Sequence, residues 1–180
     1  MSGHSKWSQI KHKKGITDKK RGQIFSKLSK AITIAAKDEP NPQFNIRLKA
    51  AIEKAKENQV PQENIERAIK KASEAGENLE ELLMEAYGPE GSAILIEAIT
   101  DSRNRTVAEV KKILKDQDAK WADPGSVMWA FEKINNDWQA KFPQKISEDG
   151  MKKLETLLEA LDNHDDVEDV ITNIDLTPSE

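Results

Sequence analysis

The sequence predicts an α+β fold in which an N-terminal three-helix bundle is followed by a ferredoxin-like βαββαβ domain with an extra leading strand. Apolar residues follow helical spacing up to about residue 73, and strand-like and helix-like segments alternate beyond it. The charge also changes sign: residues 1–73 carry 17 basic and 7 acidic side chains, and residues 74–180 carry 11 and 25. We therefore expect two domains, over residues 1–78 and 79–180, of which only the first suits an anionic partner.

The first domain is expected to contain three short amphipathic helices. Thr17 or Asp18 can cap the first, which extends to about Lys37 before two prolines end it. Its apolar positions are Ile24, Leu28, Ala31, Ile32 and Ala35. A second helix ends near Glu57 and presents Phe44, Leu48, Ala51, Ile52 and Ala55 on one face. A third follows Pro61 and presents Ile65, Ala68, Ile69 and Ala72.

The second domain is expected to begin with two strands, 82–87 and 93–99, joined by a turn at 88–91. A capping-box pattern from Thr106 to Glu109 predicts that a helix starts at Thr106. Two further strands, 126–133 and 138–144, precede a helix capped by Ser147 and a last strand at 167–174. From Ala93 this order is βαββαβ, with the 82–87 strand added in front.

A basic arm dominates the N-terminal region. Ten Lys and Arg residues lie between Gly3 and Lys37 against a single acid, so a polyphosphate is the expected partner. The alternative is a solvated, disordered run of charge. Trp7 and His12 could stack on RNA bases, although Trp7 is better explained as a hydrophobic anchor. The candidate binding residues of the arm are Lys6, Trp7, Lys11, His12, Lys13, Lys14, Lys19, Lys20 and Arg21.

A second candidate site is the segment Arg103, Asn104 and Arg105, placed just before the helix expected from Thr106. Two arginines beside a helix N-terminus combine forked donors with free backbone N–H groups, which suits a phosphate. The alternative, which the charge balance of this half favours, is that both arginines pair with nearby acids.

The sequence offers no catalytic constellation. It contains no cysteine, Gly-rich phosphate loop, nucleophile elbow or metal-spaced set of ligands, so we expect a non-enzyme with no cofactor, metal or small-molecule substrate. His164 stands in an acidic segment and is expected to be solvated. Trp121, Trp129 and Trp138 are expected in a core or on a sheet face, where an exposed pair would resemble an RNA-stacking platform. No apolar run approaches the ~20 residues that cross a membrane.

Five long motifs occur in order along the chain: GHSKWSQIKHKKG, DKKRGQIFSKLSKAI, NIRLKAAIEKAKENQVPQENIERAIKKA, EAYGPEGSAILIEAITDSRNRTVAEVKKIL and GSVMWAFEK. Together they resemble the YebC/PmpR family, which includes the mitochondrial translational activator of cytochrome c oxidase I. The similarity covers residues 2 to about 133 and resumes over about 142–175. Family members usually carry a third α/β domain between these parts. The chain therefore resembles a short form in which residues 134 to about 142 replace that domain.

The resemblance implies a nucleic-acid-binding regulator of gene expression. It indicates a ribosome- or RNA-associated translation factor in which the basic arm and the 103–105 segment bind ribosomal or messenger RNA phosphates. The alternatives are a DNA-binding transcriptional regulator and a protein–protein adaptor that uses the acidic second domain. With no presequence, the chain resembles a bacterial cytoplasmic member of the family.

Overall fold

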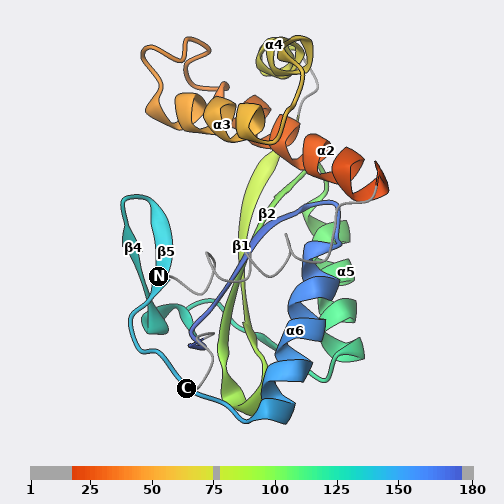
Figure 1. Ribbon diagram of the computed structural model, residues 1–180, viewed down its shortest axis with the longest axis vertical. Helices are drawn as coiled ribbons and strands as arrows, with labels where there is room; N and C mark the ends of the chain where they lie inside the picture. Colours follow the sequence, from red (N-terminus) through yellow and green to blue (C-terminus); the bar gives the residue numbers. More distant parts are fainter. Residues whose placement is uncertain (1–17, 75–77, 176–180) are drawn as a thin grey trace. The chain divides into compact units, whose positions relative to one another are not determined.

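The computed structural model describes residues 18–74 and 78–175 (Figure 1). Over these residues the chain folds into two compact units. One comprises residues 18–81 with 99–102, and the other comprises 82–98 with 103–175. The helices in chain order are α2 (Asp18–Ala35), α3 (Ile46–Glu57), α4 (Gln62–Lys71), α5 (Arg103–Asp116) and α6 (Glu148–Asp162). None of the described helices is long and apolar enough to cross a membrane.

The first unit is the predicted three-helix bundle. Its core is made of small and aliphatic side chains from α2, α3 and α4 and the segments next to them: Leu28, Ile32, Ala35, Ala36, Leu48, Ala55, Val60, Ile65 and Ala68. Asn45 joins α2 to α3, because its Oδ1 accepts the N–H of Leu48 and its Nδ2 donates to the carbonyls of Ala35 and Glu39 at 2.7 Å. One difference from prediction is Phe44, which precedes α3 and is 76% exposed instead of facing the core.

The second unit is built on a four-stranded sheet of order β3-β1-β2-β6, formed by β1 (Glu80–Tyr87), β2 (Ala93–Thr100), β3 (Lys120–Ala122) and β6 (Val167–Thr172). Strands β1 and β3 pair antiparallel, as do β2 and β6. Helices α5 and α6 cover one face of this sheet and bury Val110, Leu154, Leu157 and Leu161 against it (Figure 1). The α+β class, with helices first and an antiparallel sheet after them, is confirmed.

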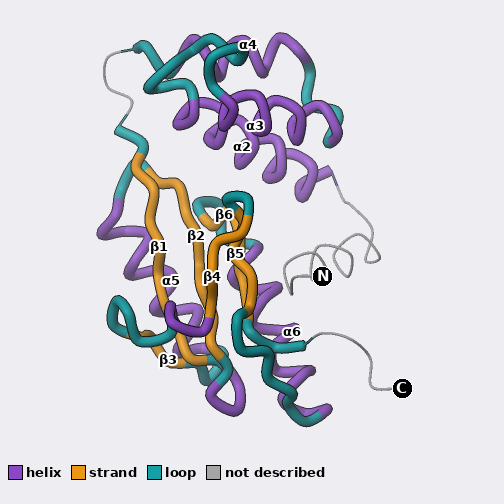
Figure 2. Tube along the Cα trace, turned by 90° about the vertical axis from the view of Figure 1, so that its left-hand side faces the viewer, coloured by secondary structure: helices purple, strands orange, loops and turns teal. Residues whose placement is uncertain are grey.

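The opposite face of the sheet is covered by a loop and a separate hairpin of β4 (Phe131–Ile134) and β5 (Asp137–Ala140) (Figure 2). Val127, Ala130 and Phe131 pack there on Leu95 and Ile171. Alternate residues of β2 therefore enter two cores, with Leu95 on this face and Ile94 and Ile96 facing the helices. Both faces of β2 are covered, which explains why its sequence is almost continuously apolar.

The strand predicted over 126–133 is wrong in its first half. Met128–Ala130 forms a 3-10 turn, and regular strand begins only at Phe131. The cause lies forty residues earlier, at the buried Glu85, whose carboxylate accepts the backbone N–H groups of Gly125, Val127 and Met128 at 2.5, 2.8 and 3.0 Å. These N–H groups are thereby unavailable to a strand ladder.

The strand order differs from the expected βαββαβ arrangement in three further respects. The short strand β3 was not predicted, and it lies at the edge of the sheet beside β1. Strand β1, expected as an addition in front of the domain, is an inner strand between β3 and β2. β4 and β5 pair only with each other and leave the main sheet. A three-residue strand is too short to show a recognisable alternation, which is why β3 was missed.

Both helices of this unit have well-defined starts. Ser147 caps α6 as predicted, since its Oγ accepts the N–H of Gly150 at 3.0 Å. Helix α5 begins at Arg103, three residues before the predicted Thr106. Thr106 is fully buried, and its hydroxyl donates to Asp166 instead of capping the helix. The 103–105 segment is thus the first turn of α5 and does not precede the helix.

Candidate nucleic-acid interface

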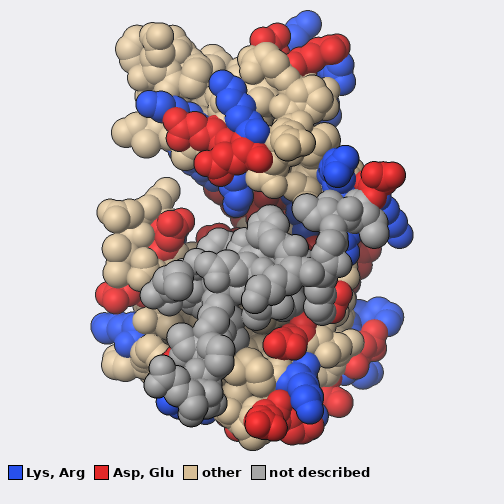
Figure 3. Space-filling model, in the orientation of Figure 1, with Lys and Arg blue, Asp and Glu red and all other residues tan. Residues whose placement is uncertain are grey.

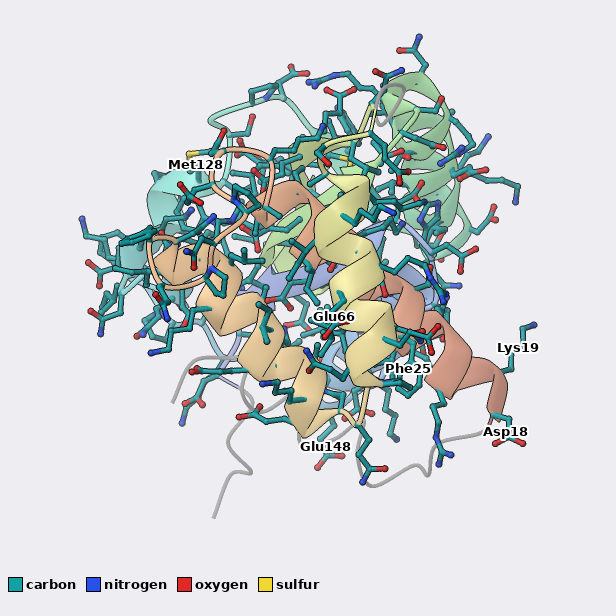
Figure 4. The ribbon with its side chains drawn as sticks, turned by 90° about the horizontal axis from the view of Figure 1, so that it is seen from above. Asp18, Lys19, Phe25, Glu66, Met128 and Glu148 are labelled. Carbon is teal, nitrogen blue, oxygen red and sulfur yellow. The ribbon has the colours of Figure 1, made fainter. Side chains whose placement is uncertain are left out.

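The described part of the basic region is the start of α2. Lys19 and Arg21 are exposed and Lys20 is half-buried in its first turns. Seen from above the bundle, Lys19 projects outward from the end of the helix, next to Asp18 (Figure 4). These three cations form the only run of three consecutive basic residues in 18–74 and 78–175. The other candidates of the arm, Lys6, Trp7, Lys11, His12, Lys13 and Lys14, lie outside the described residues.

Electrostatics at this helix end favour an anion. A helix N-terminus carries unsatisfied N–H groups and a partial positive charge, so cations there cost the helix about 0.3–1 kcal/mol each. In the first turn only Asp18 offsets them. An approaching phosphate would neutralise the lysines and also bind the helix end, so the same residues that disfavour the isolated helix favour the complex.

Gly22 leaves space beside these cations. It is exposed within α2, and a Cβ built on it would have no atom within 4 Å. A glycine inside a helix costs about 0.5–1 kcal/mol relative to alanine. No packing within the described chain requires this glycine. A ligand backbone could approach closely at this point.

The second candidate segment is occupied in part by the protein itself. Arg103, Asn104 and Arg105 are all exposed in the first turn of α5. Arg105 places its Nη2 2.6 Å from Asp166 Oδ2 and its Nε 3.9 Å from Glu109 Oε2. The alternative prediction, in which the arginine pairs with acids of the same half of the chain, is therefore correct for Arg105.

A network of hydrogen bonds surrounds this arginine. Asp166 Oδ2 also accepts the Thr106 hydroxyl at 2.7 Å, and the Asp166 N–H donates to His164 Nδ1. Because Nδ1 accepts, neutral His164 carries its hydrogen on Nε2, which lies 2.7 Å from Glu109 Oε2. The side chain of His164 is only 11% exposed, so the expectation that it is solvated was wrong. The network ties α5 to the loop between α6 and β6.

Glu109, His164 and Asp166 bring ligand atoms within 4.8 Å of one another, the spacing of a metal site. Their chemistry fits a hydrogen-bond network better than a metal ion. His164 is bonded to both carboxylate residues, and the Arg105 guanidinium already supplies positive charge to Asp166. A metal ion bound at Asp166 Oδ2 would have to compete with that arginine.

The tryptophans divide between the core and the surface. Trp121 and Trp138 are half-buried against the sheet, as expected. Trp129 is 64% exposed, whereas its neighbours Val127 and Phe131 are buried. A regular strand would put all three side chains on one face, but the 3-10 turn over Met128–Ala130 leaves Trp129 at the surface. On the face shown in Figure 3, basic and acidic side chains of the described residues are interspersed.

The sequence is similar to known proteins along most of its length. Family models for the TACO1/YebC protein N-terminal domain and the TACO1/YebC second and third domain match residues 5–75 and 79–136. A protein of Geotalea uraniireducens named "Probable transcriptional regulatory protein" is 45% identical over 98% of this chain and 70% of its own length. The chain belongs to the TACO1/YebC family.

Other relatives agree with the TACO1/YebC assignment. A protein of Natranaerobius thermophilus with the same printed name is 51% identical over 74% of the chain and 54% of its own length. The chain spans about half the length of several such relatives. A solved structure, a conserved hypothetical protein Aq1575 from Aquifex aeolicus, aligns with a TM-score of 0.82 at 30% identity, over 90% of this chain and 93% of that one. The resemblance inferred from the motifs is confirmed.

Proposed function

We propose that this protein is a non-enzymatic, nucleic-acid-binding regulator that grips RNA phosphates on the ribosome or on messenger RNA with its basic N-terminal region. The observation that carries the proposal is the run Lys19, Lys20 and Arg21 at the positive end of α2. Three successive cations at a helix N-terminus suit a phosphate backbone, which gives affinity with little choice of sequence.

The rest of α2 supports recognition of the backbone over recognition of duplex bases. From Lys27 onward its residues are buried or half-buried, and Lys27 itself is 9% exposed. A helix that enters the major groove needs a free face along its length. Only the first turns of α2 offer exposed basic side chains, so contact would be made by the end of the helix.

A DNA-binding transcriptional regulator is the second candidate. It is favoured by the names of the relatives, which describe them as probable transcriptional regulatory proteins. The same basic residues would then contact a DNA backbone. The two candidates differ in the preferred ligand and in the salt concentration at which binding persists.

The test compares affinity for purified ribosomes and for mixed-sequence duplex DNA across a salt series. The variant Lys19→Glu/Lys20→Glu/Arg21→Glu reverses the charge at the start of α2. The matched control is Lys49→Glu/Lys54→Glu/Lys56→Glu, which reverses the charge of three exposed lysines of α3. It changes the net charge of the protein by the same amount as the α2 variant. Each lost phosphate contact should flatten the slope of log K against log salt by roughly 0.7–0.9.

Tight ribosome binding that the α2 variant weakens and the α3 control retains would support the proposal. Specific DNA binding that persists at physiological salt would favour the transcriptional regulator instead. Equal binding by both variants and the unaltered protein would show that α2 is not the site. Absence of binding to either ligand would overturn both candidates in favour of a protein–protein adaptor.

A further inference from the structure

Two aromatic rings lie exposed at the base of the β4–β5 hairpin. Trp129 precedes β4 and Phe142 follows β5, and their side chains are 64% and 51% exposed. The ring centroids are 5.8 Å apart with an angle of 44° between the ring planes. Neither ring contributes to the cores of this unit. Two adjacent exposed rings offer apolar, flat surface to a ligand.

The orientation of Trp129 is set before any ligand binds. Its Nε1 donates to the carbonyl of Ser126 at 2.9 Å. The turn that carries it is anchored from below by the buried Glu85 carboxylate. Phe142 is held beside it, because the N–H of Lys141 donates to the carbonyl of Ala130 at 2.8 Å. A pre-ordered ring loses little conformational entropy on binding.

Two lysines of this region lie over aromatic rings. Lys141 Nζ lies 5.6 Å from the centroid of Phe142, and Lys133 Nζ lies 5.0 Å from that of Trp138 on the same hairpin. In the described chain neither lysine forms an ion pair, unlike Lys112 and Lys153, which pair with Asp116 and Asp149. Glu97 accepts a hydrogen bond from Trp138 Nε1 and is not paired with Lys133, so both ammonium groups could contact an anionic ligand.

The acids of the hairpin point elsewhere. Glu132 is paired with Gln139 and Asp137 with Ile134, whereas Lys133 is paired with Trp138. Side chains alternate along a strand, so these two acids lie on the opposite face of the hairpin from the Lys133–Trp138 pair. Rings beside unpaired ammonium groups match bases joined to phosphates, whereas an apolar protein surface would leave both lysines without a partner.

We propose that Trp129 and Phe142 form a stacking site for unpaired bases of a single-stranded nucleic acid, with Lys141 and Lys133 contacting its phosphates. The inference rests on the proposed function for the class of ligand and adds a site in the second unit. It also gives a preference, because the bases of a duplex are already stacked on one another and cannot reach the rings.

The experiment measures binding of the full chain to a labelled oligouridylate of about ten nucleotides, and to an RNA duplex of the same length, by fluorescence anisotropy. Trp129→Ala should weaken binding to the single strand about 5- to 150-fold, the range expected when one stacked base is lost. Trp129→Phe, which keeps an aromatic face, should recover most of the affinity. The matched control is Phe44→Ala, which removes another exposed ring from the first unit.

Duplex binding should change less than twofold in Trp129→Ala, since that ligand is held by backbone charge alone. Single-strand binding that is unaltered in both Trp129→Ala and Phe142→Ala would overturn the stacking site. If the α2 charge-reversal variant still weakened binding in that case, the proposed function would survive without it. If Trp129→Ala weakened single-strand binding and the α2 variant did not, the result would support the stacking site and refute the binding site proposed at α2. Equal losses in Phe44→Ala would also refute the stacking site.

Discussion

Arg105 Nη2 lies 2.6 Å from Asp166 Oδ2, and the same oxygen accepts the buried hydroxyl of Thr106. An arginine that the sequence offers as a phosphate ligand is thus held by a carboxylate sixty-one residues away. Asp166 is nearly buried, whereas Arg105 is 44% exposed, so solvent screens the charge of the arginine more than that of the acid. The pair anchors the start of α5 to the loop before β6.

Replacing Asp166 by alanine should destabilise the protein by about 1–3 kcal/mol, because the buried Thr106 hydroxyl and the Arg105 guanidinium would both lose the carboxylate oxygen that they share. The measurement is the free energy of unfolding from urea denaturation. The exposed acid Glu132→Ala is the control and should change stability by no more than about 0.5 kcal/mol. Equal costs at the two positions would contradict the role assigned to Asp166.

Arg105→Ala should leave affinity for ribosomes within about twofold of the unaltered protein, because its guanidinium is engaged with Asp166 and Glu109. The salt dependence of binding should also be unchanged. The same affinity and salt measurements as for the α2 variants check this. A flattened slope of log K against log salt would show instead that Arg105 leaves Asp166 to bind a phosphate.

Two helix glycines should respond differently to replacement by alanine. Gly22→Ala should stabilise the protein by about 0.5–1 kcal/mol, since its Cβ meets nothing and alanine favours the helix. A Cβ at Gly150 would lie against the Glu90 carboxylate, which accepts the N–H of Ser147. Gly150→Ala should therefore give no such gain, as it displaces that carboxylate.

A double-mutant cycle separates the effect of helix propensity at Gly150 from the effect of contact with the Glu90 carboxylate. In a Glu90→Ala background the obstructing carboxylate is absent, and Gly150→Ala should gain about 0.5–1 kcal/mol, as Gly22→Ala does. Thermal and urea unfolding of the four proteins provide the data. A Gly150→Ala effect that is the same in both backgrounds would show that Glu90 does not control this position.

Glu85→Gln should loosen the loop that carries Trp129. The amide keeps the shape of the side chain but replaces one acceptor oxygen with a donor. At least one of the three N–H groups, those of Gly125, Val127 and Met128, therefore loses its bond, at a cost of about 1–3 kcal/mol. Hydrogen exchange should accelerate at the amides of residues 125–128. The exposed Glu132→Gln serves as control, and equal exchange in both variants would argue against this anchor.

Much of the fold could be predicted from local patterns. Helices α2, α3, α4 and α6 follow from apolar spacing, and the Ser147 cap from a short motif, because a helix closes its hydrogen bonds within four residues. The family could likewise be inferred from motifs that are continuous in the chain. The basic run at Lys19–Arg21 needs no folding to be recognised, and its role as a binding site remains a prediction.

Contacts between distant segments decided the rest. Glu85 accepts hydrogen bonds from a loop forty residues away and so turns Trp129 outward. Asp166 pairs with Arg105 and accepts the hydroxyl of the buried Thr106. Neither pairing can be recognised from the local sequence, because each carboxylate lies in a segment with other acidic residues. Local sequence was enough to establish the helices, the family and the charge of the N-terminal region. Which arginine is paired and which aromatic rings face water depended on the folded chain, because burial is set by segments that meet only after folding.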